Sequence, residues 1–334
     1  MIRATQVTTG ARLHFGLYAF GPRVARQFGG VGAMVEVPLR IRVEAELADS
    51  GVRRGAGGGR LECRGPLSDR TEAFVQRWLS HHPEAPPYES LAIEVLETPA
   101  EHVGLGLGTQ LGLSISHGLT RTLLNENLSL ERTASDVGRG LRSAVGTYGF
   151  FYGGLIVDQG KREGEPVSPL HCRLPMPDDW RWVLVRGHAP SGLAGTAEQQ
   201  AFERLPSMTD GQVARLRECI FSTLLPCLAN KDFMGFSEGL HDYGRQAGEC
   251  FAEVQGGPYR NQSIADLVDL VRRWDWPGVG QSSWGPTVFI LAPSSDVAEY
   301  LVRRIRGKYS NCEVTVCRPR NEGVRLGSEC HDSM

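Results

Sequence analysis

The chain has 334 residues, 41% of them hydrophobic, so it is long enough to bury the cores of two domains. Its formal net charge of -2 excludes the strongly basic surface that non-specific nucleic-acid binding requires. No apolar run reaches the length of a membrane-spanning helix, and the N-terminal segment lacks the apolar stretch of a signal peptide. The eight cysteines are scattered, with no CxxC pair and no zinc-finger spacing. We therefore expect a cytoplasmic protein with reduced thiols and without nucleic-acid or membrane partners.

The first half of the chain predicts strands followed by helices. Strands are expected at residues 2–8, 12–20, 35–47 and 91–96, the third with alternating apolar and charged side chains. The glycine-rich run at 55–60 predicts a hairpin loop, because no helix follows it. A helix begins near Thr109 as its N-cap, and a second follows Ser129 and runs toward Arg142. Residues 153–157 predict a buried strand that ends at Asp158.

The second half follows a proline-rich connection at residues 161–180. Strands are expected at 182–186, 287–291 and 313–317, and helices at 210–229, 232–254, 263–274 (capped by Ser263) and 295–306. This order predicts an α+β sandwich with a ferredoxin-like layer. We expect an N-terminal domain at residues 1–165 and a C-terminal domain at 166–334.

The strongest local signal is the run HVGLGLGTQLG at 102–112, where alternating glycines precede an amphipathic helix. Glycine lets the backbone approach an anion closely, and the free N–H groups of the first helical turn point at the ligand. The spacing matches neither GxGxxG nor GxxxxGK[ST], which excludes the usual dinucleotide and P-loop motifs. The run is interpreted either as a phosphate-binding loop or as a tight structural turn.

Two other segments have a composition suited to ligand binding. The loop VGQSSWGPTVF at 279–289 offers hydroxyl and amide groups and one tryptophan ahead of a buried strand. In ARLHFGL at 11–17, Arg12 and His14 share one face of a strand, and the glycine-rich segment 26–32 follows. The alternatives are an ordinary loop with a buried tryptophan, a core histidine and surface arginines.

Taken in order, ARLHFGL, GGVG, HVGLGLGTQL, RGLRSAVGTYGFFYGGLIVD and GQSSWGPTVF resemble the GHMP superfamily of small-molecule kinases. The sequences of these five motifs are most similar to those of its non-kinase branch, the beta-ribofuranosylaminobenzene 5'-phosphate synthases. The resemblance covers most of the chain and implies a ribosomal S5 domain 2-like N-terminal domain and a ferredoxin-like C-terminal domain. It also implies a homodimer.

The departures from the kinase pattern concern the residues that kinases use for phosphoryl transfer. Thr109 and Gln110 occupy the positions of a Ser-Ser pair, and Gly146 aligns with the usual catalytic aspartate. Losing that carboxylate removes an important part of kinase chemistry. An ATP-dependent kinase with a replacement carboxylate remains the alternative, and a ligand-binding protein without activity is a second one.

The synthase resemblance implies a reaction between phosphoribosyl diphosphate and 4-aminobenzoate, or a 4-hydroxybenzoate-type acid, in tetrahydromethanopterin biosynthesis. Carbon dioxide and diphosphate leave, and Mg²⁺ is the expected cofactor. We expect the diphosphate on Gly104, Leu105, Gly106, Leu107, Gly108, Thr109 and Gln110, and the ribose phosphate on Arg26, Arg139 and Arg142. The ring substrate is expected on Tyr148, Phe150, Gln281, Ser282, Ser283, Trp284 and Gly285. Arg12, His14 and Glu36 are the expected catalytic residues, and Asp158 is the candidate metal ligand.

Overall fold

The described residues form two sheets, and the first sheet contains both the first and the last strand. The computed structural model describes residues 1–48, 59–187, 200 and 204–329. In these residues the first sheet has the order β11-β1-β2-β4-β3, with β5 paired to β2 and β6 paired to β5. Its strands are β1 (Ile2–Ala19), β2 (Gly29–Leu47), β3 (Arg60–Arg64), β4 (Tyr88–Glu97), β5 (Leu155–Asp158), β6 (Leu170–Leu174) and β11 (Arg325–Glu329).

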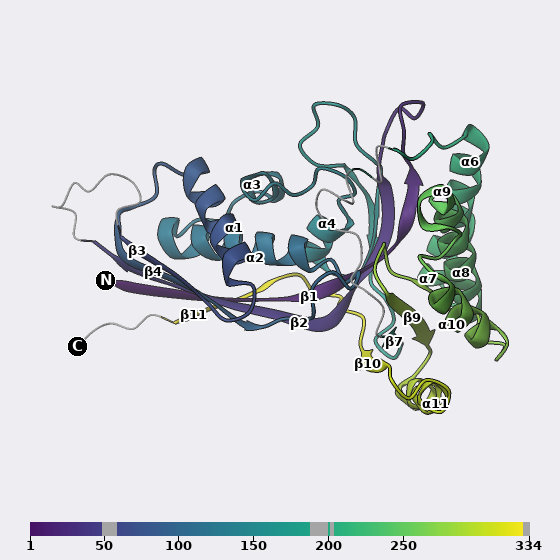
Figure 1. The fold of residues 1–334 in the computed structure, drawn as a ribbon. Coiled ribbons are helices and arrows are strands. Elements are labelled where there is room, and N and C mark those ends of the chain that lie inside the picture. The colour runs from purple at the N-terminus through teal and green to yellow at the C-terminus, as the bar shows by residue number, and fades with distance from the viewer. Residues whose placement is uncertain (49–58, 188–199, 201–203, 330–334) are drawn as a thin grey trace.

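The long antiparallel pair β1 and β2 runs through both halves of the molecule (Figure 1). β1 does not end at Gly10 as predicted; the pairing shifts between Thr9 and Ala11, which bends the strand without breaking it. The alternation predicted for β2 is confirmed, because Leu39, Ile41, Val43 and Ala45 are all buried on one face.

Helices cover one face of this sheet (Figure 1). They are α1 (Ser68–His81), α2 (Leu107–Leu119), the π-helical turn η1 (Thr120–Leu124), α3 (Leu130–Asp136) and α4 (Val145–Tyr152). Trp78 of α1 and Leu111 and Ile115 of α2 pack against β2 and β4 in one core with Val43 and Ile93. α2 is buried along most of its length, so its N-terminus is held rigidly at the centre of the molecule.

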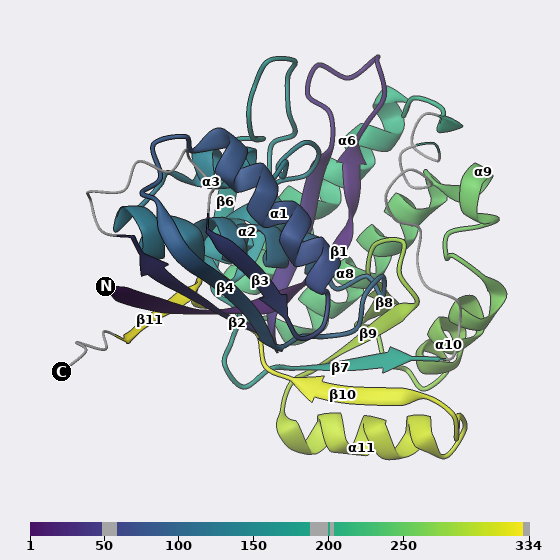
Figure 2. The same cartoon turned by 60° about the vertical axis from the view of Figure 1, so that its left-hand side comes forward.

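The second sheet is antiparallel, in the order β10-β7-β9-β8, with helices on both faces (Figure 2). Its strands are β7 (Arg181–Arg186), β8 (Val279–Gln281), β9 (Thr287–Ala292) and β10 (Glu313–Cys317). The helices are α6 (Asp210–Glu218), η2 (Cys219–Leu224), α7 (Leu225–Ala229), α8 (Phe233–Glu249), α9 (Ala252–Gln255), α10 (Gln262–Arg272) and α11 (Ser295–Arg306). Trp182 and Leu184 face α8, whereas Val183 and Val185 face α10 and α11.

Several predicted boundaries are corrected. α2 begins at Leu107, because its N-cap is Gly106 in the left-handed region (φ 68°), so Thr109 lies inside the first turn. α10 is capped by Asn261, whose side chain accepts from the amide of Ile264, and not by Ser263. α3 starts after Ser129 as predicted but ends at Asp136. Helices α1 and α4 and strands β3, β6, β8 and β11 were not predicted, and most of the 55–60 loop lies outside the described residues.

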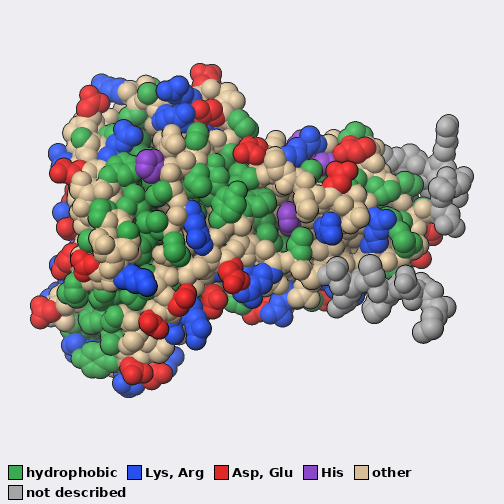
Figure 3. All heavy atoms as spheres, turned by 180° about the vertical axis from the view of Figure 1, so that it is seen from behind, with side chains coloured by type: hydrophobic (Ala, Val, Ile, Leu, Met, Phe, Trp, Pro, Cys, Tyr) green, Lys and Arg blue, Asp and Glu red, His purple; other side chains and the backbone are tan. Residues whose placement is uncertain are grey.

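The division at residue 165 does not follow the sheets. Residues 170–174 and 325–329, assigned by the prediction to the C-terminal domain, belong to the first sheet, where β11 pairs with β1. No helix in the described part of the chain is long and apolar enough to cross a membrane. Figure 3 shows positive and negative side chains interspersed over the face opposite to that of Figure 1, in keeping with a net charge of -2.

Candidate active site

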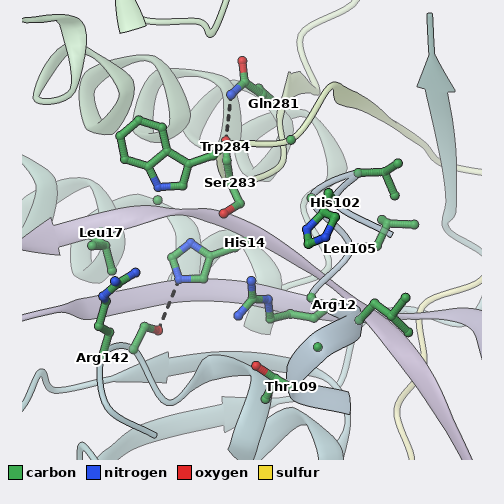
Figure 4. A pocket seen from close by; sticks show the side chains of 18 of the residues that line it. Arg12, His14, Leu17, His102, Leu105, Thr109, Arg142, Gln281, Ser283 and Trp284 are labelled. Carbon is green, nitrogen blue, oxygen red and sulfur yellow. Dashed lines mark hydrogen bonds between the residues drawn. The ribbon is translucent and has the colours of Figure 1, made fainter. Parts of the chain in front are cut away.

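A cavity of about 1010 Å³ lies where the loop before α2 meets β1 and the loop between β8 and β9. Figure 4 shows Arg12 and His14 pointing into it from β1, with Thr109 below and Trp284 and Gln281 above. Segment 138–143 and the region from α8 to residue 259 complete its walls. The cavity thus draws residues from both sheets and from all three motifs.

The predicted glycine loop forms the floor of this cavity. Gly104 and Gly106 have φ angles of 88° and 68°, a region that L-residues with side chains rarely adopt. A Cβ at Gly104 would overlap the carbonyl oxygen of Ser282 and lie 3.0 Å from the Cα of Gly285. Glycine is therefore required here both for the turn and for the contact between two loops.

Two hydrogen bonds join the glycine loop to the second motif. The Ser282 hydroxyl donates to the Gly104 carbonyl at 2.7 Å, and the Thr287 hydroxyl donates to the Val103 carbonyl at 2.6 Å. Ser282 also accepts from the backbone N–H of His14 at 3.1 Å. All three predicted motifs therefore meet at Ser282, which supports the loops and does not line the cavity.

Positive charge gathers at the α2 end of the cavity. The backbone amides of Leu107 and Gly108 have no hydrogen-bond acceptor among the described residues, and the helix dipole adds partial positive charge there. Arg12, Arg70 and Arg139 lie close to the first turn of α2, and Arg142 lines the same cavity. Among the described lining residues the only carboxylate is Glu101, which is 2.6 Å from Arg70. This end is therefore built for a polyanion.

Small residues make room for two of these guanidinium groups. A Cβ at Gly108 would overlap Arg70, whose side chain crosses the first turn of α2. A Cβ at Gly106 would lie 2.9 Å from Nε of Arg12, and one at Gly146 would lie 3.3 Å from Nη1 of Arg12. Arg70 was not predicted, because α1 carries no motif and only the fold brings it to the loop.

Aromatic side chains line the opposite end. Trp284 and Phe251 pack edge to face with ring centroids 5.0 Å apart, and Tyr259 also lines the cavity. Gln281, Ser283 and Gly285 line the cavity as predicted, and the Gln281 amide is held by the carbonyl of Ser283 at 2.7 Å. Phe251 and Tyr259 were missed, because their segment has no recognisable spacing.

Behind the cavity wall, His14 is joined through Ser143 to a buried carboxylate. Nε2 of His14 is 3.2 Å from the Ser143 hydroxyl, which donates to Asp158 at 2.8 Å. Burial, and then the positive charge of Arg12, hold the pKa of His14 well below its usual value. Burial raises the pKa of Asp158 to about 6, although several hydrogen bonds to the carboxylate act against that rise.

Several predicted site residues lie outside the cavity. Arg26 forms an ion pair with Glu165 at 2.8 Å, and Glu36 lines a small separate hollow with Arg318 and Arg320. Gln110 is buried behind the loop, where its amide donates to the Gly146 carbonyl at 2.9 Å.

The predicted ring-binding aromatics of α4 also face elsewhere. The Tyr148 hydroxyl accepts from the amide of Leu170, and its ring stacks on Tyr152. Phe150 is fully buried and packs against His117 and Phe151. Helix α4 turns both rings away from the cavity because they belong to the core beneath the first sheet.

A magnesium ion held by the protein alone would need several oxygen ligands from its side chains. The described residues contain no group of three histidine, cysteine or acidic side chains suited to a metal. Asp158 is fully buried and accepts from Ser143, Ser168 and the amides of Ala144 and Gly160. Glu101 is engaged by Arg70. These residues do not fit an ion held by the protein alone.

The comparisons with known proteins agree on one architecture. No family model matches the chain. The chain is 27% identical over 338 residues to a beta-ribofuranosylphenol 5'-phosphate synthase of Archaeoglobus fulgidus, covering 96% of this chain and 99% of that protein. The predicted resemblance is confirmed.

Solved structures extend this to the fold. Homoserine kinase from Cytophaga hutchinsonii matches with a TM-score of 0.64 at 16% identity, covering 97% of both chains. Mevalonate diphosphate decarboxylase from Enterococcus faecalis matches with a TM-score of 0.65 at 13% identity, covering 98% of this chain and 100% of that one. The GHMP-like α+β fold class is therefore confirmed. Within this GHMP fold, the cavity floor is the glycine loop before α2.

Proposed function

We propose that the chain joins a para-substituted benzoate to phosphoribosyl diphosphate, releasing carbon dioxide and diphosphate. The observation that carries this proposal is a single cavity with a cationic end and an aromatic end, in a chain similar to a ribofuranosylphenol phosphate synthase. The ring acid is 4-aminobenzoate or a 4-hydroxybenzoate-type acid; the name of the relative specifies a phenol product. The product then serves tetrahydromethanopterin biosynthesis, and we propose a homodimer as the working form.

The cationic end suits the phosphate groups of the sugar substrate. The amides at the start of α2, with Arg12 and Arg70, hold the diphosphate, and Arg139 and Arg142 hold the ribose phosphate. Arginine forks pair with phosphate oxygens in a bidentate geometry, which fixes the sugar as well as binding it. Charge that develops on the leaving diphosphate meets donors already in position, which is the largest contribution that a protein makes to such a step.

The aromatic end places the ring acid. Trp284, Phe251 and Tyr259 offer flat apolar surface, and the ring lies against it with its carboxylate-bearing carbon toward the ribose. The ring carbon attacks the anomeric carbon as the bond to diphosphate breaks, and loss of carbon dioxide restores the aromatic ring. The electron push comes from the para substituent, so the protein contributes placement and charge stabilisation.

The kinase alternative is disfavoured at Gly146. A carboxylate at this position would stand beside the guanidinium of Arg12, which occupies that part of the cavity. The remaining lining carboxylate, Glu101, is neutralised by Arg70. The described lining residues supply neither a carboxylate free to act as the base of a phosphoryl transfer nor the carboxylates that usually hold its magnesium.

The proposal is tested with carboxyl-labelled 4-aminobenzoate and 4-hydroxybenzoate, each with phosphoribosyl diphosphate and magnesium, beside a reaction with ATP and a panel of small alcohols. We expect labelled carbon dioxide that depends on both substrates. Gly106→Ala is expected to abolish most of it, because the added Cβ displaces Arg12 and strains the turn. Gly164→Ala is the matched control, since Gly164 also has a positive φ (83°) but nothing within 4 Å of the added Cβ. ADP formation without carbon dioxide release would overturn the proposal in favour of a kinase.

A further inference from the structure

At the cavity wall, hydrogen bonds connect His14 to Ser143 and Ser143 to Asp158. The partners of Asp158 determine which group is the donor in each of these bonds. Asp158 accepts from the amides of Ala144 (3.0 Å) and Gly160 (3.0 Å) and from the hydroxyls of Ser143 (2.8 Å) and Ser168 (2.6 Å). An ionised carboxylate can only accept, so the proton of the Ser143 hydroxyl is committed to Asp158. The Ser143 oxygen is then an acceptor toward His14, whose Nε2 lies 3.2 Å away.

This direction fixes the tautomer of His14. Nε2 must carry a proton in order to donate to Ser143, and the low pKa of the ring leaves it neutral near pH 7. Nδ1 therefore has a free lone pair, and it has no hydrogen-bond partner among the described residues. The His14 ring projects into the cavity between Trp284 and Arg12 (Figure 4).

The backbone of β2 is shaped to admit this contact. Gly30 lies beside the pair, and a Cβ at this position would overlap the Ser143 hydroxyl and lie 2.9 Å from Nε2 of His14. Gly30 belongs to the glycine-rich segment 26–32, and it leaves space at the start of β2 for the hydrogen bond between His14 and Ser143.

We propose that Nδ1 of His14 takes the proton from the para hydroxyl or amino group of the ring acid, and that Ser143 and Asp158 are positioning residues that set the His14 tautomer. The proposal rests on the function proposed above and names the group that handles its proton. Attack of the carboxylate-bearing ring carbon forms the bond to the anomeric carbon, and the electron pair of the broken bond leaves with diphosphate. The para O–H or N–H proton passes to His14, which leaves a neutral dienone or imine.

The second half of the cycle returns the proton. The bond to the carboxylate breaks, its electron pair re-forms the aromatic ring, and carbon dioxide leaves. The oxygen or nitrogen at the para position then recovers its proton from His14. No oxidant, reductant or further reactant is needed, and the histidine ends in its starting state.

The test is direct observation of the tautomer by long-range ¹H–¹⁵N correlation on the full-length protein with labelled histidine, assigned with His14→Gln. We expect the proton on Nε2 in the wild type, and a shift toward the Nδ1-protonated form in Ser143→Ala. Ser168→Ala is the matched control, because it removes a buried hydroxyl from the same carboxylate without touching His14. It should leave the tautomer unchanged. Gly30→Ala, which wedges the pair apart while keeping every hydroxyl, should act like Ser143→Ala.

Kinetics supply the second readout. Ser143→Ala is expected to lower kcat about 10- to 100-fold with less than about a 2-fold change in the KM for phosphoribosyl diphosphate, whereas Ser168→Ala stays within about 3-fold. Wild-type protein protonated on Nδ1 would overturn the positioning role even where synthase activity is found, since the spectrum needs no substrate. A wild-type Nε2 tautomer with unaltered kcat in Ser143→Ala would overturn the catalytic role alone.

Discussion

Gly108 lies in the first turn of α2 beneath the guanidinium of Arg70, so Gly108→Ala separates binding from stability. The residue has ordinary helical geometry, and alanine raises helix propensity by up to about 1 kcal/mol. The added methyl group overlaps the far end of Arg70, which must swing away. Losing one charge-assisted hydrogen bond to the diphosphate costs about 1.5–3 kcal/mol. We therefore expect a Kd for phosphoribosyl diphosphate roughly 10- to 150-fold higher, without loss of stability.

Titration calorimetry gives the Kd, and urea denaturation gives the free energy of unfolding. Arg70→Ala and the double variant complete a double-mutant cycle. If Gly108→Ala acts by displacing Arg70, it should change the Kd by less than about 2-fold in the Arg70→Ala background. Additive losses in the double variant, or an unchanged Kd in Gly108→Ala, would refute the assignment of Arg70 to the diphosphate.

The remaining predictions test the residues that moved into or out of the site. Trp284→Ala should raise the KM for the ring acid about 10-fold, a loss of about 1.5 kcal/mol of ring packing, whereas Tyr148→Phe should leave it unchanged; equal effects would restore Tyr148 to the site. Arg26→Ala should alter the KM for phosphoribosyl diphosphate by less than about 2-fold, because Arg26 does not line the cavity. It should lower the free energy of unfolding by less than about 1 kcal/mol, because the ion pair of Arg26 with Glu165 is partly exposed. A tenfold higher KM would contradict this. Because the pKa of Asp158 is raised to about 6 from an ordinary value of 3.8, the folded state binds its proton more tightly. Wild-type stability relative to Asp158→Asn should therefore fall as pH rises from 4 to 7, by up to about 3 kcal/mol in urea titrations, and a rise would contradict the assigned burial.

The parts of the site that sequence could predict are those in which local geometry demands particular residues. The left-handed backbone at Gly104 and Gly106 and the helix that follows them leave a visible glycine pattern. In the loop at 281–285, Gly285 is required by its close approach to the backbone of Gly104. The alternation along β2 and the apolar spacing of α11 are equally local.

Residues placed by tertiary packing left no such pattern. Arg70 reaches the loop from α1, and Phe251 and Tyr259 reach it from beyond α8, so only the folded chain brings them to the cavity. The sequence of α4 likewise does not show which way its aromatic side chains point. Tyr148 and Phe150 pack against other aromatic residues and do not line the cavity. The amino-acid composition predicted an aromatic binding site for the ring, but it could not predict which aromatic residues line that site.

Because β11 pairs with the edge of β1, the first sheet can be completed only after β11 has been synthesised. Residues 4–8 of β1 leave the ribosome long before their partners at residues 325–329. Until then, that part of β1 presents unpaired N–H and C=O groups, a surface on which another nascent chain can add a strand. A chain that stops short of residue 325 therefore keeps every residue of the cavity and still lacks the strand that closes its first sheet.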